Sequence, residues 1–264
     1  MKSKPKKIGT SGINLERLRR VLAKLQSAPD FDTAQIALNS VGQFIGLPTI
    51  AWAPDVSRPS FDLHMDAFMR KQGWPEEAMT LWWGRNVMLK SPVYIRCRFT
   101  SLPFVTDVRN DTLRLDRDAR RIEEIMMEMG LRSMITVPIH LPRAQVAKIT
   151  WAGSKSPDET RDILAQTRTE LMAAGHYFMQ AFGERTRIKS ITEEELSRLT
   201  PREWECLRLT AQGHREAETA KLMGLAPTTV RFHLDNAVRK LGASTRTHAV
   251  ALAAQLGLLG PVGN

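Results

Sequence analysis

The sequence predicts a two-domain α+β protein, in which an α/β/α sandwich over residues 14–183 precedes an all-α domain over residues 199–264. Three observations support this expectation. The chain has 264 residues, which is enough for two hydrophobic cores. In its first part, segments with helical periodicity flank short β-rich runs. Its last part holds only short helical segments with strong cap signals. Residues 1–13 are expected to form a basic tail, and the charged residues 184–198 a linker.

The first domain is predicted to begin with two helices, over residues 14–28 and 31–45. TIAWAP then reads as a strand. WPEEAMTLWWGRNVML follows, with a proline suited to the first helical position and two glutamates suited to the positive end of the helix dipole. MITVPIHL and VAKITWAG, joined by PRAQ, predict a hairpin, and a long helix is expected over residues 157–183. Helices on both sides of a small sheet are typical of PAS- and GAF-like sensor domains.

The composition limits the class of protein. The formal net charge of +10 favours a polyanionic partner, although the basic start of the chain is more simply a solvated tail. The 2 cysteines stand far apart, which excludes a disulfide framework. No apolar run in the sequence is long enough to cross a membrane, and the first residues lack the apolar core of a signal peptide. We therefore expect a cytoplasmic protein without a membrane partner.

The sequence offers no catalytic residues and no metal ligands. Its 6 histidines show no metal-binding spacing, and it contains no CxxC, GxGxxG, Walker-type or GxSxG motif. We expect neither an enzyme nor a bound cofactor. A small-molecule signal of unknown identity stays open.

The last domain is predicted to consist of four short helices. Thr200 can cap the first helix, with Pro201 at its first position and Glu203 completing a capping box. A tight turn between the second and third helices is typical of a helix-turn-helix unit. A glycine follows each of the later helices, which are expected over residues 215–223, 227–241 and 245–256.

One face of the third helix does not suit a protein core. On a helical wheel, Val230 and Leu234 lie on the inward side, while Phe232 lies among polar residues on the opposite side. Such a helix fits the major groove of DNA, where an exposed ring can contact a thymine methyl group. The alternative is that Phe232 packs against the first domain. We predict a DNA-binding set of Thr228, Thr229, Arg231, Phe232, His233, Asn236, Arg239 and Lys240.

Three segments of this domain, LTPREWECLRLTAQG, ETAKLMGLAPTTVRFHLDNAVRKLGA and HAVALAAQLGLL, resemble the DNA-binding domain of LuxR-type transcription regulators. The resemblance implies that Thr229 and Lys240 contact phosphates, and that Val230 and Leu241 belong to the core. It also implies a homodimer on double-stranded DNA, with RNA polymerase or a regulatory protein as a possible further partner. We expect the pairing face on the last helix at Ala249, Leu252 and Leu256. Departures that weaken helix caps or packing fall at Arg215, Thr219 and Ala226.

The first domain carries a second resemblance. WPEEAMTLWWGRNVMLKSPVY, SLPFVTD and GLRSMITVPIHLP are similar to the acyl-homoserine-lactone (autoinducer-binding) domain of quorum-sensing regulators. A phospho-receiver domain fits less well, because no acidic pair closes the first strand. The family pattern is Trp-x3-Tyr, then Asp-Pro, then Trp and Gly, and this chain retains only Pro92. The predicted ligand-pocket positions are Ala78, Trp82, Ser91, Thr106 and Met134.

These substitutions change the hydrogen bonds that the resemblance implies. In the family the aspartate accepts the ligand's amide N–H, while the tryptophan and tyrosine donate to its carbonyl groups. Ser91 can accept only a neutral hydrogen bond, which is roughly half as strong as a charge-assisted one. Ala78 donates nothing. We predict that the ligand is not a standard acyl-homoserine lactone. The alternative is that Trp83 or Thr106 supplies replacement hydrogen bonds.

The sequence thus predicts a sequence-specific DNA-binding transcription regulator of the LuxR family, of a divergent or orphan quorum-sensing type. The alternative is a ligand-independent regulator whose first domain serves dimerisation or protein interaction. An open apolar cavity near the predicted pocket positions would favour the first hypothesis, and side chains that fill it would favour the second.

Overall fold

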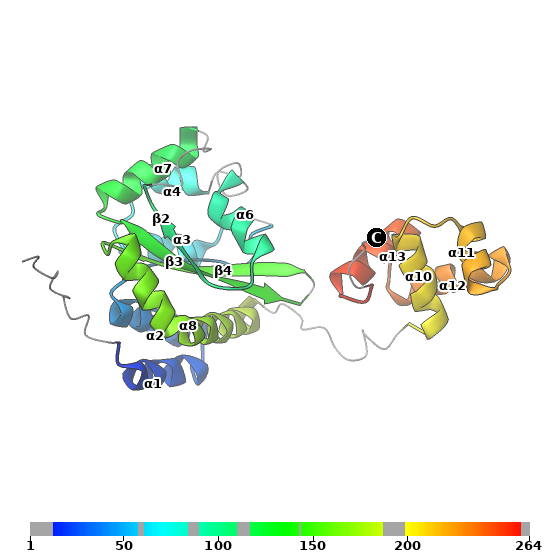
Figure 1. Ribbon diagram of the computed structural model, residues 1–264, viewed down its shortest axis with the longest axis horizontal. Coiled ribbons are helices and arrows are strands. Elements are labelled where there is room, and N and C mark those ends of the chain that lie inside the picture. The colour runs from blue at the N-terminus through cyan, green and yellow to red at the C-terminus, as the bar shows by residue number, and fades with distance from the viewer. Residues whose placement is uncertain are drawn as a thin grey trace, which may run out of the picture. The chain divides into compact units, whose positions relative to one another are not determined.

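The computed structural model describes residues 13–57, 61–83, 90–109, 117–142, 144–186 and 199–259. They form two compact units, one within residues 13–186 and one that includes residues 199–259 (Figure 1). The predicted basic tail, apart from residue 13, and the predicted linker after residue 186 lie outside the described residues.

A four-stranded sheet forms the middle layer of the first unit, with the strand order β1-β4-β3-β2. The β1–β4 and β2–β3 pairs are antiparallel, and Ala51 lies opposite Thr150 while Thr106 lies opposite Met134. Residues directly opposite each other share a face, and all four of these residues line the same side of the sheet. The strands are β1 (Thr49–Ala53), β2 (Phe104–Asp107), β3 (Ser133–Leu141) and β4 (Gln145–Gly153).

Helices cover both faces of this sheet, which confirms the predicted α/β/α sandwich (Figure 1). The face away from these four residues packs on α8 through buried apolar residues such as Ile135 and Ile139 of β3. Gly175 permits the close approach, because a Cβ there would lie only 3.0 Å from Ile139 Cδ1. On that face lie α1 (Leu15–Gln26), α2 (Phe31–Ile45) and α8 (Pro157–Thr186). On the opposite face lie α4 (Glu76–Trp82), α6 (Pro92–Phe99) and α7 (Arg117–Glu128).

Gln72, the residue that follows α3 (Leu63–Lys71), forms hydrogen bonds with the backbone of the edge strand β1. The Ile50 N–H donates to Gln72 Oε1 at 2.6 Å, and Gln72 Nε2 donates to the Ile50 carbonyl oxygen at 2.8 Å. An edge strand presents unpaired backbone groups, and one glutamine amide here satisfies two of them.

Several elements differ from the sequence expectation. The elements expected from the sequence do not include α3, α6, α7 or β2. β2 has 4 residues and α6 has 8, too few for a clear periodicity. α7 has 12 residues and does show a helical period, with Ile122, Ile125 and Met126 on its buried side. The helix expected to have Pro75 at its first position begins instead at Glu76. Pro75 is its N-cap, because its ψ of 154° is extended. The end of that expected helix, residues 84–89, lies outside the described residues.

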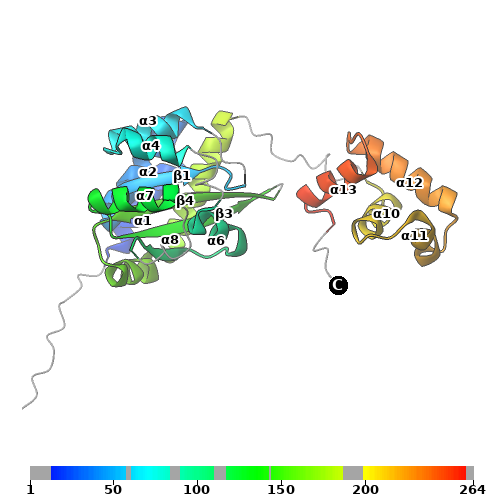
Figure 2. The same cartoon turned by 90° about the horizontal axis from the view of Figure 1, so that it is seen from above.

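The second unit packs four helices around one small core, as predicted (Figure 2). The Thr200 side chain accepts from the Glu203 N–H, and the Glu203 carboxylate accepts from the Thr200 N–H, so the predicted capping box is present. Buried Val230, Leu234 and Ala237 face this core. The helices are α10 (Pro201–Ala211), α11 (Glu216–Met223), α12 (Pro227–Lys240) and α13 (Arg246–Gln255).

Candidate nucleic-acid interface and ligand cavity

The outer face of α12 is arranged as a groove-binding helix requires. Phe232 is 63% exposed, and the centre of its ring lies 5.9 Å from that of the neighbouring His233 ring. Val230 and Leu234 on the inward side are buried. The predicted set divides by exposure: Thr228, Arg231, Phe232 and Arg239 are exposed, and Thr229, His233, Asn236 and Lys240 are half-buried.

Arg231 is held by an ion-pair network that joins three helices. Its Nε and Nη2 donate to Glu216 Oε2 of α11 at 3.1 and 3.0 Å. Arg246 of α13 also pairs with Glu216, and its Nη2 lies 2.8 Å from Asp235 Oδ1. The hydrogen bonds from Arg231 and Arg246 lower the pKa of Glu216. A DNA base and Glu216 would therefore compete for the Arg231 guanidinium.

Lys240 has a partner inside the domain. Its Nζ donates to Glu203 Oε2 at 2.7 Å, and the Glu203 side chain is only 4% exposed. Burial opposes ionisation of Glu203, but the hydrogen bonds from Lys240 and Thr200 outweigh it and lower the pKa. The ion pair thus joins the end of α12 to the start of α10, a role of Lys240 that the sequence pattern does not reveal.

The expected pairing face on α13 needs a correction. Ala249 is fully buried in the core of the second unit, so it is not available to a partner chain. Leu252 and Leu256 are half-buried. If α13 pairs, these two leucines carry the contact.

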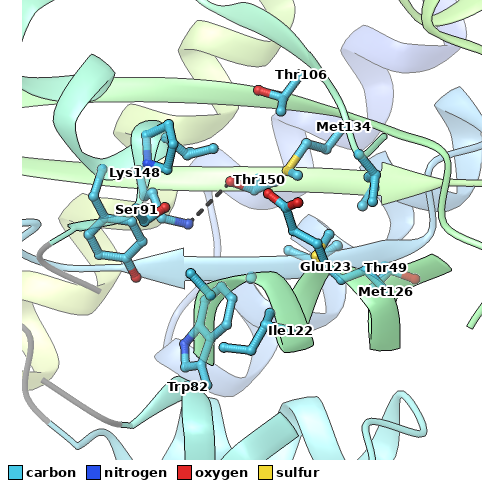
Figure 3. Close-up of a pocket in the computed structure, with 18 of the residues that line it drawn as sticks. Thr49, Trp82, Ser91, Thr106, Ile122, Glu123, Met126, Met134, Lys148 and Thr150 are labelled. Carbon is cyan, nitrogen blue, oxygen red and sulfur yellow. Dashed lines mark hydrogen bonds between the residues drawn. The ribbon is translucent and has the colours of Figure 1, made fainter. Parts of the chain in front are cut away.

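A cavity of about 90 Å³ lies between the sheet and the helices α4, α6 and α7 (Figure 3). On the same measure one water molecule needs roughly 10–15 Å³, so the space is several waters in size. Four predicted pocket residues, Trp82, Ser91, Thr106 and Met134, line it. Ala78 is fully buried but does not line it. Further lining residues include Ile50, Trp74, Tyr94, Val108, Ile122, Glu123, Met126, Lys148 and Thr150.

The cavity presents buried hydrogen-bond donors. Within the described ranges, Trp74 Nε1, Trp82 Nε1 and the Tyr94 hydroxyl are buried without a hydrogen-bond partner. Buried polar groups normally have partners, so these three groups are available to donate to a molecule bound in the cavity. Burial raises the pKa of Tyr94, which keeps its hydroxyl a donor.

A buried lysine lies at the same place. Lys148 of β4 is 2% exposed, and its Nζ lies 3.3 Å from Thr150 Oγ1. The ammonium also lies 4.8 Å from the centre of the Tyr94 ring and 5.8 Å from that of Trp82. Burial lowers the pKa of Lys148 to about 8. The residues expected in the pocket do not include Lys148, although a lone lysine within the β-rich run VAKITWAG is a signal that the sequence offers.

Trp83 is already engaged and is not a replacement donor for the cavity. Its Nε1 donates to Asp66 Oδ1 at 2.8 Å, and Arg70 Nε donates to Asp66 Oδ2 at 2.7 Å. Both hydrogen bonds, that of Arg70 above all, lower the pKa of Asp66. An ion pair joins two of the helices over the cavity. Arg121 of α7 donates two hydrogen bonds to the carboxylate of Glu77 of α4, at 2.7 and 2.9 Å.

Two kinds of feature are absent from the residues that the structure describes. They contain no group of three or more His, Cys, Asp or Glu side chains placed to hold a metal ion. Nor does any helix among them combine the length and apolar character needed to cross a membrane.

Comparisons with known proteins agree with both halves of this picture. Residues 197–253 match the family model described as bacterial regulatory proteins, luxR family, and residues 32–182 match the autoinducer binding domain. The HTH-type quorum sensing-dependent transcriptional regulator RpaR of Rhodopseudomonas palustris is 33% identical over 204 residues, 76% of this chain and 79% of that protein. The transcriptional activator protein BjaR1 of Bradyrhizobium diazoefficiens is 28% identical over 203 residues, 77% and 81% of the two chains. The crystal structure of Escherichia coli SdiA has a TM-score of 0.57 at 19% identity, covering 94% of this chain and 99% of that chain.

Proposed function

This chain belongs to the luxR family of bacterial regulatory proteins, and from that premise we propose that it binds an operator as a homodimer and responds to a small molecule other than a standard acyl-homoserine lactone. Members of the family are DNA-binding transcription regulators and not enzymes. The helix-turn-helix unit is the DNA-binding part of this chain, and residues 32–182 are its autoinducer-binding domain.

The DNA part of the proposal assigns α12 to the major groove. Arg231, Phe232 and Asn236 read base edges, because they project from its outer face or flank. Thr229 and Lys240 contact phosphates at its two ends. The exposed Phe232 ring is the observation that supports this assignment, because a large apolar side chain in that position has no role in the core. In a homodimer, two such helices meet half-sites about one helical turn apart.

The signal part rests on the content of the cavity. Donors are present, as the indoles of Trp74 and Trp82 and the hydroxyl of Tyr94. The position that the family gives to a carboxylate acceptor holds Ser91 instead. The cavity also carries the ammonium of Lys148, which a neutral lactone does not neutralise. A ligand-independent first domain has less support, because this space is open and not filled by side chains.

Thermal shift of the full chain against acyl-homoserine lactones of short to long chain length tests the signal proposal. We expect no stabilisation by low micromolar lactone. A shift of several degrees that Ser91→Ala abolishes would refute the proposal. The dimer is tested by light scattering at micromolar concentration with and without operator DNA, and a monomeric mass in both conditions would contradict it.

A further inference from the structure

Lys148 is a charged side chain in a buried position. Its neighbours along β4, Ala147 and Ile149, are buried on the other face of the sheet, while Lys148 itself points into the cavity (Figure 3). An ammonium removed from water is strongly unfavourable unless an anion or several hydrogen bonds compensate for the lost solvation. The residue therefore predicts a compensating group.

The described residues do not supply that group. The Lys148 ammonium contacts the Thr150 hydroxyl at 3.3 Å and the faces of the Tyr94 and Trp82 rings. It also interacts with the Cys97 thiol, which is neutral at pH 7 because burial raises its pKa to about 11. An acidic side chain is not among these partners. Glu123 lines the same cavity from α7, but Figure 3 shows its carboxylate and the ammonium on either side of Thr150.

The other polar groups of the cavity also favour an anionic ligand. The Tyr94 hydroxyl and the indole N–H groups of Trp74 and Trp82 can all donate, and each lacks a partner among the residues that the structure describes. A cluster of donors beside an ammonium fits an anionic acceptor. The other lining residues include hydroxyl groups and Glu123, and an apolar part formed by Ile122, Met126 and Met134.

We propose that the cavity binds an amphipathic carboxylic acid, with its carboxylate on the Lys148 ammonium and the Tyr94 hydroxyl and its apolar body against α7. This inference rests on the proposed function, because it names the chemical class of the signal for the same cavity. It assigns opposite effects to the two charged lining residues. Lys148 attracts the carboxylate, and Glu123 repels it.

The test measures binding of octanoate to the full chain by calorimetry at pH 7, with octanamide and methyl octanoate as neutral probes of the same length. We expect octanoate to bind at least about tenfold more tightly than either neutral probe, because charge-assisted hydrogen bonds are the stronger ones. Lys148→Met should remove this preference, and Tyr94→Phe, which keeps the ring, should weaken octanoate more than the two neutral probes. The matched control is Lys24→Met on the exposed side of α1, which should change nothing.

Glu123→Gln separates this inference from the proposed function. It should tighten octanoate binding, whereas a ligand that donates an amide N–H to Glu123 should bind more weakly. Equal binding of octanoate and octanamide, or full retention of octanoate by Lys148→Met, overturns the carboxylate assignment and leaves the non-lactone proposal standing. The carboxylate assignment is also overturned if none of a series of acids from butyrate to dodecanoate binds. If the wild-type chain binds a lactone and Glu123→Gln weakens that binding, both the carboxylate assignment and the non-lactone proposal are overturned.

Discussion

Replacing Lys148 by methionine should stabilise the first domain in the absence of ligand. Methionine fills a similar volume without the buried charge, and replacements of this kind are often stabilising. The magnitude follows from the pKa of Lys148, which burial lowers from 10.5 to about 8. At about 1.4 kcal/mol for each pH unit, the charged lysine reduces the free energy of unfolding at neutral pH by about 3 kcal/mol.

The sign of the pH dependence follows from proton linkage. Between pH 8 and 10.5 the unfolded chain holds a proton on Lys148 that the folded chain has released, so stability rises with pH in that window. Below about pH 8 both states are protonated and the full penalty applies. The wild-type protein should therefore gain about 3 kcal/mol relative to Lys148→Met as the pH rises through this range, because titrating groups that do not interact with Lys148 cancel in the difference. The Cys97 thiol does interact with Lys148, but burial raises its pKa to about 11, above this range in the folded chain.

Urea unfolding of both proteins, followed by tryptophan fluorescence at pH 7 and near pH 10, measures this difference directly. A Lys148→Met variant that is less stable than the wild type at pH 7 would refute the reasoning, because the lysine would then contribute a favourable interaction. A stability difference that does not change with pH would refute the lowered pKa.

Three further predictions concern the second unit. Phe232→Ala should weaken operator binding by about 1–3 kcal/mol and relax the base preference at one position, whereas Phe99→Ala, which removes a ring that is 85% exposed, should do neither in the same electrophoretic mobility assay. Lys240→Ala should lower the free energy of unfolding by about 2–3 kcal/mol, because it leaves the buried Glu203 carboxylate without its ammonium, and exposed Lys221→Ala should not. Since the pKa of Glu203 is lowered in the folded state, that contribution is present above the ordinary value of 4.5 and disappears as the pH falls through the lowered pKa, which acid titration of unfolding detects. Ala226→Ser should stabilise the unit by about 1 kcal/mol in thermal unfolding, because Ala226 already has the extended backbone of an N-cap but offers no side-chain acceptor.

The DNA-binding helix could be predicted almost completely from the sequence, because its inward and outward faces are set by the period of a single helix. Val230 and Leu234 are buried and Phe232 is exposed, as a helical wheel requires. The partners of its charged residues could not be predicted in this way. The ion pairs from Arg231 to Glu216 and from Lys240 to Glu203 join different helices, and they depend on how those helices pack.

The ligand cavity was harder to predict, because its lining comes from elements spread along the whole first domain. Matching positions to a family pattern located Trp82 and Ser91 in the lining but failed for Ala78, whose methyl group does not reach the space. Trp74, four residues earlier, supplies an indole instead, and its ring centre lies 5.9 Å from that of Trp82. Lys148 could be located only once the pairing of β1 with β4 fixed which face of the sheet it occupies.

The same lysine links the occupancy of the cavity to the stability of the regulator. A buried charge that costs about 3 kcal/mol leaves the empty domain weaker, whereas a ligand at one hundred times its dissociation constant adds about 2.7 kcal/mol. At that concentration the proposed carboxylate would offset most of the cost of the buried charge. Limited proteolysis tests this coupling: octanoate should protect the wild-type chain, and Lys148→Met should resist cleavage equally with and without octanoate. Protection of Lys148→Met by octanoate would show that the acid stabilises the domain through other contacts and that the buried ammonium is not the coupling element.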